Sequence, residues 1–173
     1  MAVLNLPARW CRRLGFRCRL LTAALALMAT PAWAQVEEAA LKAAFVYNIV
    51  AFSNWNRGGS ADTLVICANT RSSLDAALVD LGGRRIGQRR IAVRRNTGYA
   101  GCDVLVHAGD AKPKPADAAT LIICDGCQLP DGVSAVALVR EGNRIRFDVD
   151  TGSVAVAGIS LSSQLLRLAR QVL

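Results

Sequence analysis

The sequence predicts a single α/β domain with a mixed β-sheet of about five to six strands flanked by helices, the N- and C-terminal helices packing on the sheet. Two observations predict this class. Short apolar runs typical of buried strands recur through the middle of the chain, and segments with helical spacing of apolar residues stand at both ends. The 173 residues, 53% hydrophobic and 20% charged, suit one globular domain and exclude a disordered chain.

The first 34 residues have the features of a secretory signal peptide. They contain five arginines and no acidic residue, then an apolar stretch over residues 20–29 and small residues before a cleavage site. The apolar stretch is much shorter than the roughly 20 residues that a transmembrane helix needs. We therefore expect export to the periplasm, cleavage after Ala34, and a mature domain over residues 35–173.

Removal of this leader changes the charge of the protein. The whole chain has 21 Lys and Arg against 13 Asp and Glu, a net charge of +8. Five of the basic residues belong to the leader, so the mature domain has 16 basic and 13 acidic residues and a net charge of +3. We therefore expect no nucleic-acid partner.

The first half of the mature chain predicts two helices and two strands. Residues 37–55 form an amphipathic helix, because apolar side chains recur at three- or four-residue spacing. These side chains are Leu41, Phe45, Ile49 and Phe52. Residues 63–67 indicate a strand buried on both faces, residues 74–81 a helix capped by a preceding serine, and residues 86–95 a strand flanked by arginines.

The second half predicts strands, a hairpin and a closing helix. Residues 103–106 and 120–123 are apolar runs typical of buried strands. Residues 133–149 predict a hairpin, since polar and apolar residues alternate in its second arm after a Glu-Gly-Asn turn. Residues 159–173 place leucines and a valine on one helical stripe and predict a C-terminal helix.

Four cysteines remain after the leader, an even number that favours two disulfides in an oxidising compartment. They are Cys67, Cys102, Cys124 and Cys127. Three pairings are open, and a bridge between Cys67 and Cys102 would join the end of one strand to the start of another. Cys124 and Cys127 form a C-x-x-C pair followed by a turn, which favours a structural bridge and leaves a thiol-disulfide protein as an alternative.

No pattern in the sequence indicates an enzyme, a cofactor or a metal site. His107 is the only histidine, so both a nucleophilic centre and a zinc site would depend on it. We expect His107 to be structural or on the surface. Asp148 and Asp150 share one face of a strand, and we expect both to be solvated.

Arginines cluster around the strand over residues 86–95. Those within it are Arg89, Arg90, Arg94 and Arg95. They indicate either a surface for an acidic protein, an anion or a nucleotide, or a solvated edge strand protected by charge. A small-ligand or anion sensor domain is therefore a second alternative function.

Several stretches resemble the YfiR-like family of periplasmic regulators. Residues 42–55 read KAAFVYNIVAFSNW, close to that family's opening helix. Residues 142–150 read GNRIRFDVD and residues 157–169 read AGISLSSQLLRLA, close to its closing elements. Cys67 and the CDVL run that begins at Cys102 match its strand-end cysteine and C-D-V-L elements.

The resemblance implies a non-enzymatic repressor. It implies that the protein binds the periplasmic sensor region of a membrane diguanylate cyclase, lowering cyclic-di-GMP and biofilm formation. A second copy of the chain and an outer-membrane lipoprotein are further partners that it implies. We expect the partner-binding residues to lie on the first helix and the arginine strand: Tyr47, Trp55, Arg89, Arg90, Arg94 and Arg95.

Overall fold

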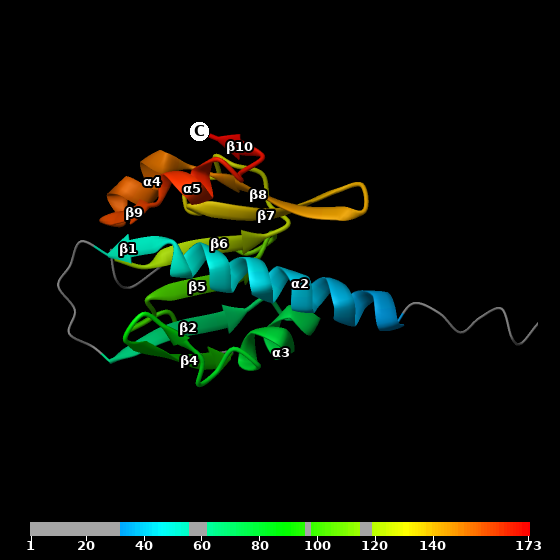
Figure 1. The fold of residues 1–173 in the computed structure, drawn as a ribbon. Helices are drawn as coiled ribbons and strands as arrows, with labels where there is room; N and C mark the ends of the chain where they lie inside the picture. The colour runs from blue at the N-terminus through cyan, green and yellow to red at the C-terminus, as the bar shows by residue number, and fades with distance from the viewer. Residues whose placement is uncertain (1–31, 56–61, 96–97, 115–118) are drawn as a thin grey trace, which may run out of the picture. The chain divides into compact units, whose positions relative to one another are not determined.

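The computed structural model describes residues 32–55, 62–95, 98–114 and 119–173, and Gln35–Leu173 form one compact unit (Figure 1). Residues 1–31 of the expected leader lie outside the described residues. Among the described helices, none combines the length and the hydrophobicity that a membrane span requires.

An eight-stranded mixed sheet organises this unit (Figure 1). Its strands are β2 (Thr63–Asn69), β3 (Arg85–Ile86), β4 (Arg89–Arg95), β5 (Val104–Ala108), β6 (Leu121–Asp125), β7 (Val136–Glu141), β8 (Arg144–Val149) and β10 (Gln171–Val172). The strand order is β10-β8-β7-β6-β5-β2-β4-β3, and the five strands from β7 to β4 in that order run parallel. The predicted mixed α/β class is confirmed: six strands have five or more residues, and β3 and β10 add two-residue edges.

The helices pack their apolar side chains against one face of the sheet. They are α2 (Ala32–Ala51), α3 (Ser73–Val79), α4 (Thr151–Val156) and α5 (Ser163–Leu166). Helix α2 crosses the middle strands (Figure 1), and its Val46, Ile49 and Val50 are fully buried in the core. The opposite face of the sheet carries a smaller cluster of Cys67, Cys102 and Leu105.

Two of the predicted elements match closely. Ser72 caps α3, since its side chain accepts a hydrogen bond from the Leu74 backbone N–H, and Leu74 and Leu78 are buried as expected. The predicted hairpin is β7 and β8, paired antiparallel with Glu141 opposite Arg144. Alternation buries Ile145 and leaves Arg144 exposed in its second arm.

The first helix ends earlier than the sequence predicts. Its last residue is Ala51, and Ser53–Trp55 form strand β1, which pairs antiparallel with β9 (Ile159–Leu161) in a separate two-stranded sheet. The Ser53 hydroxyl donates to the Ile49 carbonyl at 2.6 Å, in the last turn of the helix. Pairing with β9 therefore replaces a further helical turn.

The predicted helix over residues 159–173 is wrong. This segment consists of β9, the single turn α5 and the edge strand β10. Gly158 adopts a left-handed φ of 66° just before it, and Ser162 caps α5 by accepting from the Leu165 N–H. Strand pairing on both sides of α5 outweighs the helical spacing of the leucines.

Candidate functional site

Trp55 and Arg89 are brought together at the end of the sheet where the parallel strands begin. The Arg89 guanidinium carbon lies 5.7 Å from the centre of the Trp55 ring, a cation–π distance. Arg89 Nη2 lies 2.9 Å from Asp103 Oδ1 and donates to the Thr63 carbonyl at 2.9 Å. Asp103 Oδ2 accepts from the Val65 N–H at 2.7 Å, so this arginine links the amino ends of β2, β4 and β5.

A cavity of about 520 Å³ adjoins this pair, and we call it the Trp55 cavity. Its lining includes Asn54, Trp55, Leu64, Ile86, Arg89 and Asp103. Within the described part of the chain, the buried Trp55 indole nitrogen Nε1 has no hydrogen-bond partner. The cavity is therefore bordered by an aromatic ring and by a paired guanidinium and carboxylate, while the indole N–H is itself buried.

The predicted binding arginines do not form one patch. Arg94 points to the first disulfide: its Nη2 lies 3.5 Å from Cys67 Sγ and 3.6 Å from Cys102 Sγ. The same nitrogen donates to the Ala100 and Gly101 carbonyls at 2.8 and 2.7 Å. Arg94 therefore organises the turn that precedes β5.

The remaining predicted binding residues also lie apart from one another and differ in role. Arg90 and Arg95 are exposed near opposite ends of β4. The Tyr47 hydroxyl donates to the Arg85 carbonyl at 2.9 Å, so this tyrosine anchors α2 to β3.

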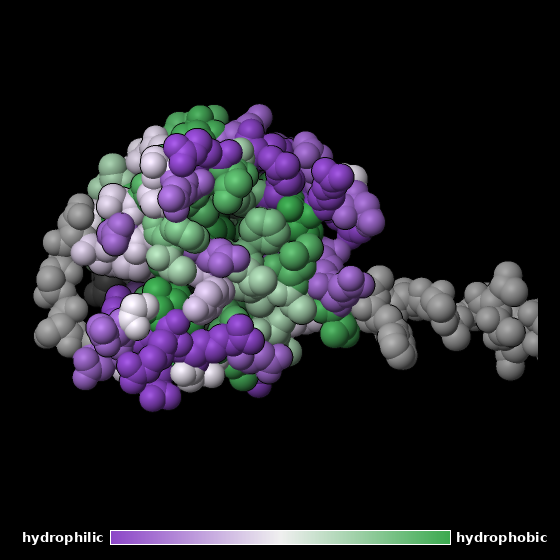
Figure 2. Space-filling view, in the orientation of Figure 1, coloured by the Kyte–Doolittle hydropathy of each residue, from purple (hydrophilic) through white to green (hydrophobic). Residues whose placement is uncertain are grey.

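A second cavity of about 650 Å³, which we call the α2–α5 groove, lies between α2, β8 and α5. Its apolar lining is Phe45, Ile49, Phe52, Phe147, Leu165 and Leu168. Phe52 is 41% exposed and Leu168 is 66% exposed, and Arg146 and Arg167 also line the groove. Figure 2 shows hydrophobic side chains gathered along α2 with hydrophilic side chains on both sides of them. The sequence predicts Phe52 on a helix face, whereas in the structure it follows the last residue of α2, and no pattern in the sequence places Leu168 beside it.

The cysteines form two bridges. Cys67 and Cys102 are joined with an S–S distance of 2.03 Å and close a span of 35 residues. Cys124 and Cys127 are joined across three residues, and the chain after Cys127 is a loop up to β7. Because no helix begins at that point of the described chain, the C-x-x-C pair lacks the helix N-terminus that stabilises a thiolate in oxidoreductases.

His107 is buried beside the second bridge rather than exposed. It is directly opposite Cys124 in the β5–β6 register and is 1% exposed. Its Nδ1 lies 2.7 Å from the Ala108 carbonyl and its Nε2 lies 3.1 Å from Ser134 Oγ. Burial lowers the pKa of His107, although the hydrogen bond to Ala108 and the charges of Asp131 and Asp110 oppose that shift.

Ser134 connects His107 to an acid that the sequence analysis missed. The Ser134 hydroxyl donates to Asp131 Oδ2 at 2.7 Å. The serine lies between the acid and the histidine and is fully buried. A hydroxyl in that position is not accessible to a substrate, so the three residues do not have the arrangement of a nucleophilic triad.

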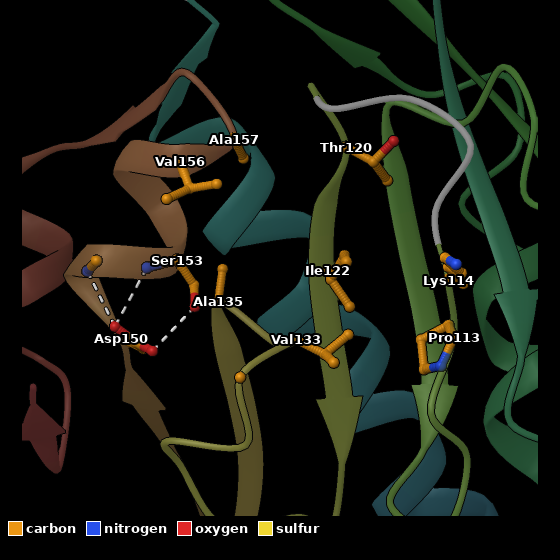
Figure 3. Close-up of a pocket in the computed structure, with 12 residues that line it drawn as sticks. Pro113, Lys114, Thr120, Ile122, Val133, Ala135, Asp150, Ser153, Val156 and Ala157 are labelled. Atoms are coloured by element: carbon orange, nitrogen blue, oxygen red, sulfur yellow. Dashed lines mark hydrogen bonds between the residues drawn. The ribbon is translucent and has the colours of Figure 1, made fainter.

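A third cavity, of about 540 Å³, lies between β6, the start of β7 and α4 (Figure 3). Its walls are mostly apolar, with Ile122, Val133 and Val156 among them. Asp150 also lines it but caps α4, since it accepts from the Gly152 and Ser153 N–H groups at 2.9 and 3.2 Å. This carboxylate is therefore already paired, and the expectation that it is simply solvated is corrected.

The comparisons with known proteins agree with this structure. No curated protein matches the chain. A family model described as YfiR/HmsC-like matches residues 39–170, which is most of the chain. That family is periplasmic and regulatory rather than catalytic. The chain therefore belongs to the YfiR/HmsC-like family.

Proposed function

We propose that this protein is a periplasmic repressor of an inner-membrane diguanylate cyclase. It binds the periplasmic sensor region of the cyclase and holds the enzyme inactive, so that cyclic-di-GMP stays low and biofilm formation is restrained. Family membership supports a regulator, and the exposed apolar α2–α5 groove is the observation that supports action by docking.

The groove has the composition of a protein-binding surface. Phe52 and Leu168 leave apolar area in water, and covering the exposed part of each contributes a fraction of the roughly 1.5 to 3 kcal/mol that full burial of such a side chain is worth. Arg146 and Arg167 add positive charge at the same place. The cyclase segment that would fit this groove is apolar with acidic residues on either side. Attraction between those acidic residues and the two arginines would speed association and fix the orientation of the segment.

The other predicted binding residues surround the C-terminal end of α2 or lie on β4. Trp55 lies in β1, just after this end of the helix, and the Arg89 guanidinium lies over the Trp55 ring. Arg90 and Arg95 have exposed side chains, and we assign them to steering of the partner rather than to anchoring. A second copy of the chain, or an outer-membrane lipoprotein, that covered the same groove would compete with the cyclase.

The test is binding of the exported protein to the periplasmic region of a cyclase from the same organism. We expect Phe52→Ser to weaken binding at least about tenfold, equivalent to about 1.4 kcal/mol. Leu41→Ser is the control, since Leu41 is a 47% exposed apolar residue of α2 that does not line the groove. Circular dichroism checks that both variants are folded.

A deletion strain supplies the cellular readout. We expect cyclic-di-GMP to rise on deletion, and we expect Leu41→Ser but not Phe52→Ser to restore the low level. An unchanged nucleotide level together with no binding would reject the proposal. Equal loss of binding in both variants would reject the groove as the docking surface.

A small-ligand sensor is a second candidate, and the Trp55 cavity, lined by Trp55 and Arg89, favours it. A ligand there would pack against the indole ring beside the guanidinium. A thermal-shift screen against small anionic metabolites tests this, with Trp55→Phe as the variant that removes the larger indole ring. Absence of any shift in the parent protein, or an equal shift in Trp55→Phe, would reject the ligand site.

A further inference from the structure

Two sulfurs and a carboxylate lie close together at the end of strand β6 and in the loop that follows it. Cys124 Sγ, Cys127 Sγ and a carboxylate oxygen of Asp131 all lie within 4.8 Å of one another. Cys124 is buried, Cys127 is half-buried and Asp131 is exposed, so the cluster opens to solvent on its acidic side. From the sequence alone we expect no zinc site, because one histidine and four oxidised cysteines give too few ligands. Asp131 supplies a ligand that this count omits.

The Asp131 carboxylate is held in place by its own loop. Its Oδ1 accepts from the Val133 and Ser134 N–H groups at 2.8 and 2.6 Å, and its Oδ2 accepts from Ser134 Oγ. These three hydrogen bonds orient the carboxylate before any ligand arrives.

The loop that carries the two sulfurs is also fixed by its neighbours. The Gly126 N–H donates to the Leu138 carbonyl on β7 at 2.9 Å. On the other side the Gly109 N–H donates to the Asp125 carbonyl at 2.9 Å, and Lys42 pairs with Asp125 at 2.9 Å. These contacts do not depend on the S–S bond, so they keep the backbone of both cysteines near Asp131 when that bond is opened, and the sulfurs can then move apart as two ligands of one metal require.

We propose that the reduced form of this cluster binds Zn²⁺ through the Cys124 and Cys127 thiolates and the Asp131 carboxylate. The C-x-x-C spacing and the mixed sulfur and oxygen donors suit this borderline cation. Three protein ligands leave the fourth tetrahedral position to water or to a donor from a partner. This goes beyond the proposed repressor function, since it gives the regulator a second, metal-bound state.

The chemistry requires a reductant, and a dithiol protein of the periplasm is the class that supplies it. The dithiol transfers two electrons and two protons to the Cys124–Cys127 bond and itself becomes a disulfide. Zn²⁺ then displaces the two thiol protons to solvent as the thiolates bind. Cys67 and Cys102 are only 2% and 4% exposed, so the first bridge is shielded from the same reductant.

The test titrates the exported protein with Co²⁺, a spectroscopic substitute for Zn²⁺, after reduction with a phosphine. We expect one equivalent of cobalt, a thiolate-to-cobalt charge-transfer band, and loss of that band when Zn²⁺ is added. Cys127→Ser should abolish the band. Asp131→Asn should weaken binding at least about tenfold, whereas Asp110→Asn, which removes an exposed carboxylate from a nearby loop, should not change it.

Circular dichroism and a count of free thiols confirm that each variant is folded and reduced. A reduced, folded parent protein without the charge-transfer band would overturn the proposal. Equal cobalt affinity in Asp131→Asn and Asp110→Asn would also overturn it, since the metal would then be held by the thiolates without Asp131. Neither result depends on whether a cyclase is bound.

Discussion

Arg170 covers the buried carboxylate of Asp148 with two hydrogen bonds. Arg170 Nε donates to Asp148 Oδ1 at 2.8 Å, and Nη2 donates to Oδ2. The side chain of Asp148 is 3% exposed and that of Arg170 is 33% exposed. The hydrogen bond to Asp148 raises the pKa of Arg170. The expectation that Asp148 is solvated is therefore wrong: its partner comes from residue 170, just before β10.

Arg170→Gln should destabilise the protein because it leaves an ionised carboxylate in a buried position without its cation. We expect the urea midpoint at pH 7 to fall further for Arg170→Gln than for Asp148→Asn, which removes the charge that needs pairing. When Asp148→Asn is already present, adding Arg170→Gln should lower the urea midpoint by less than Arg170→Gln does alone. Arg167→Gln is the control, since it removes an exposed arginine nearby. Equal effects of Arg170→Gln and Arg167→Gln would contradict this account.

Removal of the first bridge should lower the free energy of unfolding substantially. Cys67 and Cys102 close a 35-residue span, for which the chain-entropy model gives roughly 3 to 4 kcal/mol. Replacing both by alanine should produce that loss in urea unfolding. Replacing both Cys124 and Cys127, which close a three-residue span, should cost about half as much or less. A larger loss from the second pair would show that chain entropy is not the main contribution.

Local patterns in the sequence predict the central strands, the capped helix α3 and the hairpin well. Alternation in β8 and the serine before α3 act within a few residues, so they can be seen without the fold. The same reading of local patterns gives the wrong structure for the C-terminal segment. Its leucines have helical spacing, but the segment pairs as β9 with β1 and as β10 with β8. Such distant strand partners leave no local signal.

The candidate sites were less predictable than the fold. The sequence predicts Trp55 and Arg89 as separate binding residues, and only the fold brings the last residue of β1 into contact with the first residue of β4. Asp131 was missed although its hydroxyl partner Ser134 and the Cys127 sulfur belong to residues within four positions of it, because an irregular loop has no repeating pattern from which side-chain directions can be predicted. Charge and cysteine counts identify residue types, whereas a site depends on which of them the sheet places side by side.

His107 should make the protein less stable in mild acid. Burial lowers its folded pKa below the ordinary value of about 6.5, so the unfolded chain binds more protons between those two values. The stability that neutral His107 contributes is complete above about pH 6.5 and is lost as the pH falls through the folded pKa. Because the chain has one histidine, NMR titration of its ring gives the folded pKa directly.

The same effect can be checked by unfolding. The free energy of unfolding should decrease on going from pH 7.5 to pH 5, and His107→Asn should show a smaller decrease. The negative charges of Asp131 and Asp110 favour the charged form of the ring, so Asp110→Asn should lower the NMR pKa further. A folded pKa at or above 6.5 would contradict the prediction.

Gly109 should not tolerate a side chain, because the backbone of the C-x-x-C loop passes directly against it. A Cβ at Gly109 would lie 2.9 Å from the Gly126 carbonyl carbon and 3.0 Å from the Cys127 nitrogen. Backbone atoms cannot move aside as a flexible side chain can. Gly109→Ala should therefore push the loop away from β5 at a cost of about 1 to 3 kcal/mol.

The matched control is Gly98→Ala, since a Cβ there meets no described atom within 4 Å. Urea unfolding should show the loss for Gly109→Ala and little change for Gly98→Ala. Because the Cys124–Cys127 loop shifts in Gly109→Ala, its thiols should also react faster with a thiol reagent after reduction. If the two variants unfolded at the same urea concentration, the close approach of Gly109 to Gly126 would not contribute to stability.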